Sequence, residues 1–176
     1  MVGGERLYRL GEAELGLDEL GTEVSRPLEE LLRRLLSCPY KLRSFVVFGS
    51  RARGDWRPWS DTDVVIIMEL PTPLRWGKLW ELGLPGDVLD LASEACVEER
   101  IFTPRQFERL LRSFSLTALD ALEEGLVLYD DGYWRALKAE FEDMKRRGLM
   151  RKSPDGWNIP PVSYTHLRAH ETEADL

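Results

Sequence analysis

The sequence predicts one α/β domain, and three observations lead to this prediction. Short apolar runs alternate with segments whose apolar residues repeat at helical spacing, the pattern of strands interleaved with helices. The 176 residues are enough for one substantial hydrophobic core but not for two. An apolar fraction of 43% and a charged fraction of 31% are ordinary for a globular protein. We therefore expect a small sheet covered by helices.

The chain begins with an arm and a helix. Residues 1–24 are rich in glycine and glutamate and have weak periodicity, which indicates a loosely packed N-terminal arm or short helical turns. A helix is predicted from Ser25, acting as its cap, to about Ser37. Pro27 suits an early helical position, and the leucines that follow it repeat at helical spacing.

Two apolar runs predict the centre of the sheet. Residues 45–48 and 64–68 are almost entirely apolar, as expected for strands that are buried on both faces. The first run ends at Gly49, and a polar loop separates it from the second. The segment 74–95 is predicted to be mostly helical, with a break where glycine and proline cluster at 83–86.

The second half of the chain repeats the alternation. Residues 97–102 predict a third strand, less apolar than the first two. Thr103, Pro104 and Gln106 then form a capping-box arrangement at the start of a helix. The remaining predicted elements are a helix over 115–124 that Gly125 ends, an edge strand over 126–129 and a last helix over 133–147.

These elements place one domain over residues 25–152, followed by a polar tail over 153–176 with little periodicity. Within the tail, residues 161–172 resemble a translated sequencing-adapter or vector read-through that occurs on unrelated proteins. We therefore take the chain as native only to about residue 161 and leave the rest out of functional reasoning.

The overall charge and the cysteines limit the classes of partner. A net charge of −7 disfavours binding to long nucleic acid, which depends on a basic face, and favours a small-molecule or protein substrate. No apolar run is long enough for a membrane span, and the N-terminus lacks the apolar stretch of a secretory signal. Cys38 and Cys96 lie far apart without a second pair. We expect a cytoplasmic protein with reduced thiols.

The segment 45–68 carries the chemistry. Gly49 has no Cβ, so a phosphate can approach the backbone closely. Ser50 adds a hydroxyl and an amide where the chain enters a helical turn, whose free N–H groups suit anions. Asp61 and Asp63 are two residues apart at the start of a strand, so their side chains point to the same face. Such a carboxylate pair suits Mg²⁺, which binds proteins through one or two carboxylates together with substrate phosphates.

Each of these features is common in ordinary turns, and only their combination between two buried strands favours a site. Arg51 and Arg53 are candidate nucleotide-binding residues together with Gly49 and Ser50. An arginine in this loop could contact a triphosphate, and Arg53 could equally hold the loop by pairing with an acid. Tryptophans 56 and 59 could stack on a base, but packing of the loop against its own domain is the more common use of such residues.

The residues Gly49 to Gly54 (GSRARG) and Ser60 to Asp63 (SDTD) resemble the signature of the polymerase-β-like nucleotidyltransferase superfamily, and most closely its minimal (MNT) branch. The resemblance is strong over 42–68 and weak over 102–107 and 124–129. It implies the nucleotidyltransferase fold, a small mixed sheet flanked by helices. It also implies Mg²⁺-dependent transfer of a nucleoside monophosphate, usually AMP from ATP, to an acceptor hydroxyl, with two Mg²⁺ ions expected. Many small members are antitoxins paired with a helical HEPN ribonuclease, which some of them adenylylate.

The resemblance also implies a third carboxylate on the next strand. The family's spacing, five residues before a Thr-Pro helix start, places this carboxylate at Glu98, and Asp90 is the rival. The implied catalytic and metal-binding set is therefore Asp61, Asp63 and Glu98. The alternatives to an enzyme are an antitoxin-like binding module, which neutralises a partner by contact, and a degenerate nucleotide sensor without catalysis.

Overall fold

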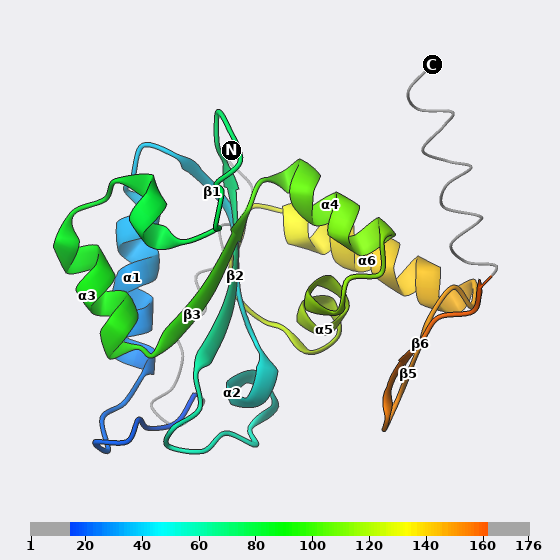
Figure 1. The fold of residues 1–176 in the computed structure, drawn as a ribbon, viewed down its shortest axis with the longest axis horizontal. Coiled ribbons are helices and arrows are strands. Elements are labelled where there is room, and N and C mark those ends of the chain that lie inside the picture. The colour runs from blue at the N-terminus through cyan, green and yellow to red at the C-terminus, as the bar shows by residue number, and fades with distance from the viewer. Residues whose placement is uncertain (1–14, 162–176) are drawn as a thin grey trace.

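The computed structural model describes residues 15–161. Its centre is a four-stranded sheet in the order β3-β2-β1-β4 (Figure 1). Strand β1 is antiparallel to both β2 and β4, while β3 is parallel to β2, so the sheet is mixed as predicted. The strands are β1 (Lys41–Phe48), β2 (Thr62–Glu69), β3 (Val97–Phe102) and β4 (Leu126–Asp130).

Helices cover both faces of this sheet (Figure 1). On one face α1 (Ser25–Leu36) and α3 (Gly86–Glu94) pack against side chains such as Val64 and Ile66. On the other face α4 (Pro104–Arg112), α5 (Leu116–Glu124) and α6 (Tyr133–Arg146) pack against Val65 and Ile67. Consecutive residues of β2 thus enter two different cores, which explains its continuous apolar sequence. None of the helices between residues 15 and 161 combines the length and apolarity that crossing a membrane requires.

Local sequence signals explain several boundaries. Thr103 N–H donates to Gln106 Oε1 at 2.8 Å, and Gln106 N–H donates to Thr103 Oγ1 at 3.3 Å. This is the predicted capping box, and it fixes the turn from β3 into α4. Gly125 ends α5 as predicted, but with a φ of −65° it does not use the left-handed conformation. A Cβ at Gly125 would collide with the carbonyl of Ala121, so close packing requires the glycine.

Two predicted helix starts were wrong. Ser25 is the first helical residue of α1 rather than its cap, and its buried hydroxyl has no hydrogen-bond partner within residues 15–161. The helix predicted from residue 74 begins only with the 3₁₀ helix η1 (Leu79–Leu82). The preceding residues are held against the edge of β3 instead, where Ile101 N–H donates to the carbonyl of Gly77 at 2.9 Å. Edge pairing therefore replaces helical hydrogen bonds in this segment.

The ends of the described chain are packed more tightly than predicted. Leu15 and Val24 are fully buried in the same core as α1, so both ends of the segment 15–24 are packed, while most residues between them are exposed. At the other end, the hairpin β5 (Arg151–Ser153) and β6 (Gly156–Asn158) crosses the predicted boundary between residues 152 and 153. Trp157 Nε1 donates to Asp120 Oδ1 at 2.8 Å, which ties the hairpin to α5. Residues 162–176, on which the expectation of non-native sequence falls, lie outside the described residues.

Candidate active site

The two halves of the motif meet where β1 ends and β2 begins. Phe48, the last residue of β1, pairs with Asp63 near the start of β2. Gly49 follows at once, with a φ of +74°, and opens the short helix α2 (Gly49–Arg53) with Ser50 in its first turn. A Cβ at Gly49 would lie 2.5 Å from Asp63 Oδ2. Glycine is therefore required by both the backbone conformation and the close approach of the carboxylate.

Thr62 fixes the direction of the two neighbouring aspartates. Its hydroxyl donates to the carbonyl of Ala95, and its N–H donates to the carbonyl of Cys96, both at 2.7 Å. Thr62 is fully buried on the α1–α3 face, so Asp63 alternates to the opposite face of β2, while Asp61 is exposed just before the strand begins. Within residues 15–161 neither aspartate side chain makes a hydrogen bond or an ion pair. Both carboxylates are therefore available to a cation.

The pKa of Asp63 also indicates a site that would accept a cation. Burial raises the pKa of Asp63, the positive charge of Arg100 opposes this rise, and the negative charges of Asp61 and Glu98 add to it. A half-buried carboxylate such as that of Asp63, with negative charges nearby and no hydrogen-bond or ion-pair partner among residues 15–161, is costly in the free protein. A divalent cation would offset that cost, so the residues present fit Mg²⁺.

This cost gives a first prediction: Asp63→Asn should raise the melting temperature of the protein without nucleotide. The folded-state pKa of Asp63 is raised above its unfolded value, so the folded state binds the proton more tightly. Stability must then fall as pH rises through the window between the two pKa values. In thermal unfolding, the melting temperature of the variant should exceed that of wild type at about pH 7. This difference should shrink toward about pH 4, near the unfolded pKa of aspartate. A variant that is less stable than wild type at both pH values contradicts this account.

The third carboxylate lies on the adjacent strand. Glu98 pairs in register with Asp63, so the two side chains share one face of the sheet. Asp90 is exposed on α3, on the other side of the sheet, so the geometry favours Glu98 over its rival. However, the carboxylate of Glu98 accepts a hydrogen bond from Lys78 Nζ at 2.8 Å. Among the described residues, no three acidic, histidine or cysteine side chains are close enough together to hold a metal ion.

The two candidate arginines bind protein groups. The guanidinium of Arg51 is 1% exposed and donates to the carbonyls of Ser60, Leu15 and Leu17, at distances from 2.7 to 3.3 Å. Arg51 therefore anchors the loop, whereas the sequence suggested a contact with the nucleotide. Arg53 pairs with Glu124 at 2.7 Å and with Asp55 at 3.3 Å, the loop-holding alternative that the sequence left open.

Comparison with known proteins decides the family. A sequence-family model described as "Nucleotidyltransferase domain" matches residues 28–147, a range that contains the whole sheet and every candidate site residue. The chain belongs to this nucleotidyltransferase family. No curated protein matches the chain.

Several solved structures are similar to this nucleotidyltransferase. A toxin–antitoxin with AMP-PNP is 20% identical, with 70% of this chain and 88% of that chain covered and a TM-score of 0.45. A mutant of the toxin–antitoxin MntA–HpeT is 18% identical, with coverage of 70% and 88% and a TM-score of 0.43. A tri-AMPylated Shewanella oneidensis HEPN toxin in complex with MNT antitoxin gives 21% identity, coverage of 70% and 85% and a TM-score of 0.39. These scores are too low to add to the assignment, which rests on the family match.

Sequence reasoning missed two basic residues beside the candidate site, Lys78 and Arg100. Lys78 comes from the segment before η1, and no sequence pattern connects it with Glu98. Arg100 follows Glu98 by two residues on β3, so the strand period of two places both on one face. The sequence signal for Arg100 was therefore present once the strand was assigned.

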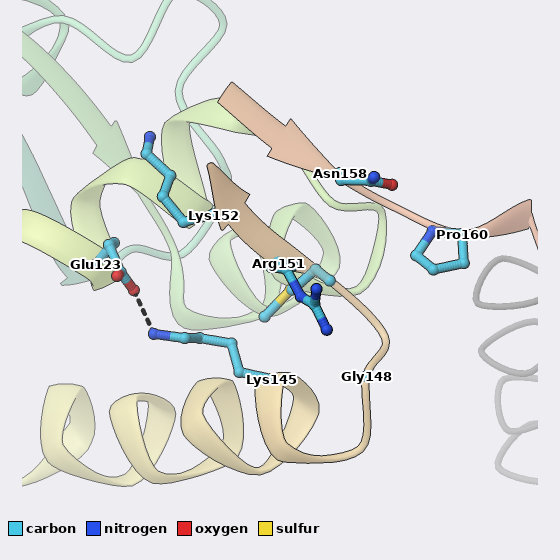
Figure 2. A pocket seen from close by; sticks show the side chains of 8 residues that line it. Glu123, Lys145, Gly148, Arg151, Lys152, Asn158 and Pro160 are labelled. Carbon is cyan, nitrogen blue, oxygen red and sulfur yellow. Dashed lines mark hydrogen bonds and ion pairs between the residues drawn. The ribbon is translucent and has the colours of Figure 1, made fainter. Parts of the chain in front are cut away.

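A pocket of about 370 Å³ lies elsewhere, between the C-terminal end of α6 and the β5–β6 hairpin (Figure 2). Glu123, Lys145 and Arg151 are among the residues that line it. Lys145 Nζ pairs with Glu123 Oε2 at 2.7 Å, so the positive charge of that lysine is already compensated. None of the elements around this pocket carries Asp61, Asp63 or Glu98, so we do not assign the nucleotide to it.

Proposed function

We propose that this nucleotidyltransferase moves a nucleoside monophosphate, AMP from ATP, to an acceptor hydroxyl in a Mg²⁺-dependent reaction. The observation that carries the proposal is the pair Asp61 and Asp63, whose carboxylates have no hydrogen-bond or ion-pair partner in the described chain, with Gly49 packed closely against Asp63. The family assignment supports a nucleotide substrate. The choice of ATP rests on the resemblance of the Gly49–Gly54 and Ser60–Asp63 segments to the MNT branch.

In the proposed mechanism Glu98 serves both as a metal ligand and as the base, and the other residues have one role each. Asp61 and Asp63, with Glu98 as the third ligand, would hold one or two Mg²⁺ ions. Bound Mg²⁺ supplies positive charge that neutralises the triphosphate. Gly49 leaves space for the β- and γ-phosphates, and Ser50 offers them its hydroxyl and amide.

The transfer step exchanges one bond to phosphorus for another. The acceptor oxygen attacks the α-phosphorus in line, its proton passes to the carboxylate of Glu98, and the bond from the α-phosphorus to the bridging oxygen breaks so that pyrophosphate leaves. Lys78 holds Glu98 in the free protein and must release or share that carboxylate.

The proposed acceptor is a hydroxyl on a partner protein, a helical HEPN-type toxin, in the cytoplasm. Support comes from the resemblance to the MNT branch, and the net charge of −7 argues against nucleic acid as the acceptor. The second candidate is an antitoxin-like binding module without catalysis. The ion pair between Lys78 and Glu98 favours it, because a third carboxylate tied to lysine is not free for a metal or a proton.

Glu98→Gln separates these two functions. We expect the variant to transfer labelled AMP to a HEPN-type partner at least ~100-fold more slowly, the usual scale for losing a general base. Its dissociation constant for Mg·ATP should stay within about threefold of wild type, because Asp61 and Asp63 remain. Asp90→Asn removes the same charge on the other side of the sheet and should leave both values unchanged. If Glu98→Gln transfers AMP as fast as wild type, Glu98 is not the base. If wild type transfers no AMP to such a partner, the binding module is favoured.

A further inference from the structure

The cations around the candidate active site differ in what already binds them. Arg51 is buried, and backbone carbonyls take up its donors. Arg53 bridges Glu124 and Asp55. Lys78 Nζ donates to Glu98 at 2.8 Å and to the carbonyl of Glu99 at 3.2 Å. The donors of Arg51 are therefore taken up by backbone carbonyls inside the protein, and the charges of Arg53 and Lys78 are paired with carboxylates.

Arg100 differs from these three residues in its partners. Its NH1 donates to Thr117 Oγ1 at 2.6 Å, and within residues 15–161 it forms no ion pair. A neutral hydroxyl orients a guanidinium but does not compensate its charge. The side chain is exposed, so an incoming anion can reach it.

The position of Arg100 is set by the sheet. In the register of β2 and β3, Glu98 lies beside Asp63 and Arg100 lies beside Val65. Arg100 is thus a diagonal neighbour of Asp63 on the same face, within reach of a side chain as long as arginine. Gly49 approaches Asp63 from the other side, on β1. Asp63 therefore lies between Gly49 and a guanidinium that acts on it at a distance and forms no ion pair within residues 15–161.

We propose that Arg100 binds the phosphates of the nucleoside triphosphate, and this inference rests on the proposed function. The planar guanidinium offers paired N–H donors that match phosphate oxygens, which a lysine ammonium cannot reproduce. Thr117, from the first turn of α5, holds the side chain in place before the nucleotide arrives. Arg100 thereby takes the role that the sequence had suggested for Arg51 and Arg53.

Binding measurements on the full chain test this assignment. Titration calorimetry with Mg²⁺ and a non-hydrolysable ATP analogue should give a dissociation constant ~10- to 100-fold weaker for Arg100→Gln, the scale of one or two charge-assisted hydrogen bonds. AMP, which lacks the β- and γ-phosphates, should bind wild type and variant within about twofold. Arg100→Lys should fall between them, because it keeps the charge but loses the paired donors.

Arg105→Gln is the matched control, since it also removes one exposed positive charge. Arg105 lies at the start of α4, which follows the C-terminal end of β3, whereas Glu98 lies near the N-terminal end of that strand. It should bind the analogue like wild type. If Arg100→Gln binds the analogue as tightly as wild type does, or weakens AMP binding equally, the assignment of Arg100 is wrong and the proposed function stands. If wild type itself shows no Mg²⁺-dependent binding of the analogue, the proposed function fails, and the inference fails with it.

Discussion

Changing Asp61 and Asp63 together to asparagine is expected to abolish the stabilisation of the protein by Mg²⁺ and ATP and to reduce transfer at least ~1,000-fold. A ligand that binds only the folded state stabilises it by mass action, by about 2.7 kcal/mol at a concentration 100 times its dissociation constant. For a chain of this size that corresponds to a rise of roughly 5–10 °C in melting temperature. The double variant has no carboxylate pair to hold the metal under the triphosphate, so the rise should disappear.

Poor folding of the double variant is not expected to cause the loss of the rise in melting temperature. Asparagine at position 63 removes the half-buried charge whose pKa is raised, so the variant should fold at least as stably as wild type. Asp90→Asn, which makes the same chemical change on α3, should keep the full shift. Melting curves over a series of ATP concentrations, with Mg²⁺ and with excess chelator, measure both effects. A double variant that shifts as much as wild type would place the metal and nucleotide elsewhere.

The parts of this fold that the sequence predicted well are those determined by neighbours in the chain. The capping box at Thr103 and Gln106 spans one turn, and its hydrogen bonds form as the local pattern indicates. The meeting of Gly49 with Asp63 is nearly as local, because one loop joins two antiparallel strands and brings their ends together. In such cases residue spacing and strand geometry are sufficient.

Contacts between distant segments could not be predicted in the same way. Arg51 binds the carbonyl of Leu15, 36 residues away, and a backbone carbonyl gives no signal in the sequence. Lys78 reaches Glu98 only because the segment before η1 lies along the edge of β3. For this reason the sequence suggested a loosely packed segment 15–24 and an Arg51 side chain that was free to bind a nucleotide.

The second large effect is expected from Arg51→Ala, which should lower the free energy of unfolding by about 3 kcal/mol, or the melting temperature by roughly 6–12 °C. The change leaves carbonyls of Leu15 and Ser60 without their donors in a buried place and opens a cavity beside Trp56. Arg53→Ala breaks ion pairs of a side chain that is 44% exposed, so it should cost less than about 1 kcal/mol.

Chemical denaturation of both variants, followed by Mg·ATP binding at a temperature where both are folded, separates anchoring from ligand contact. As an anchor, Arg51 acts through the loop that leads into Asp61, so Arg51→Ala should lose stability first and nucleotide affinity only as a consequence. Arg51→Lys should recover little stability, because an ammonium cannot donate to Ser60 and Leu15 together through a planar fork. If instead Arg51→Ala is as stable as Arg53→Ala but loses Mg·ATP binding, the guanidinium contacts the nucleotide, and its burial against the N-terminal segment is not its main role.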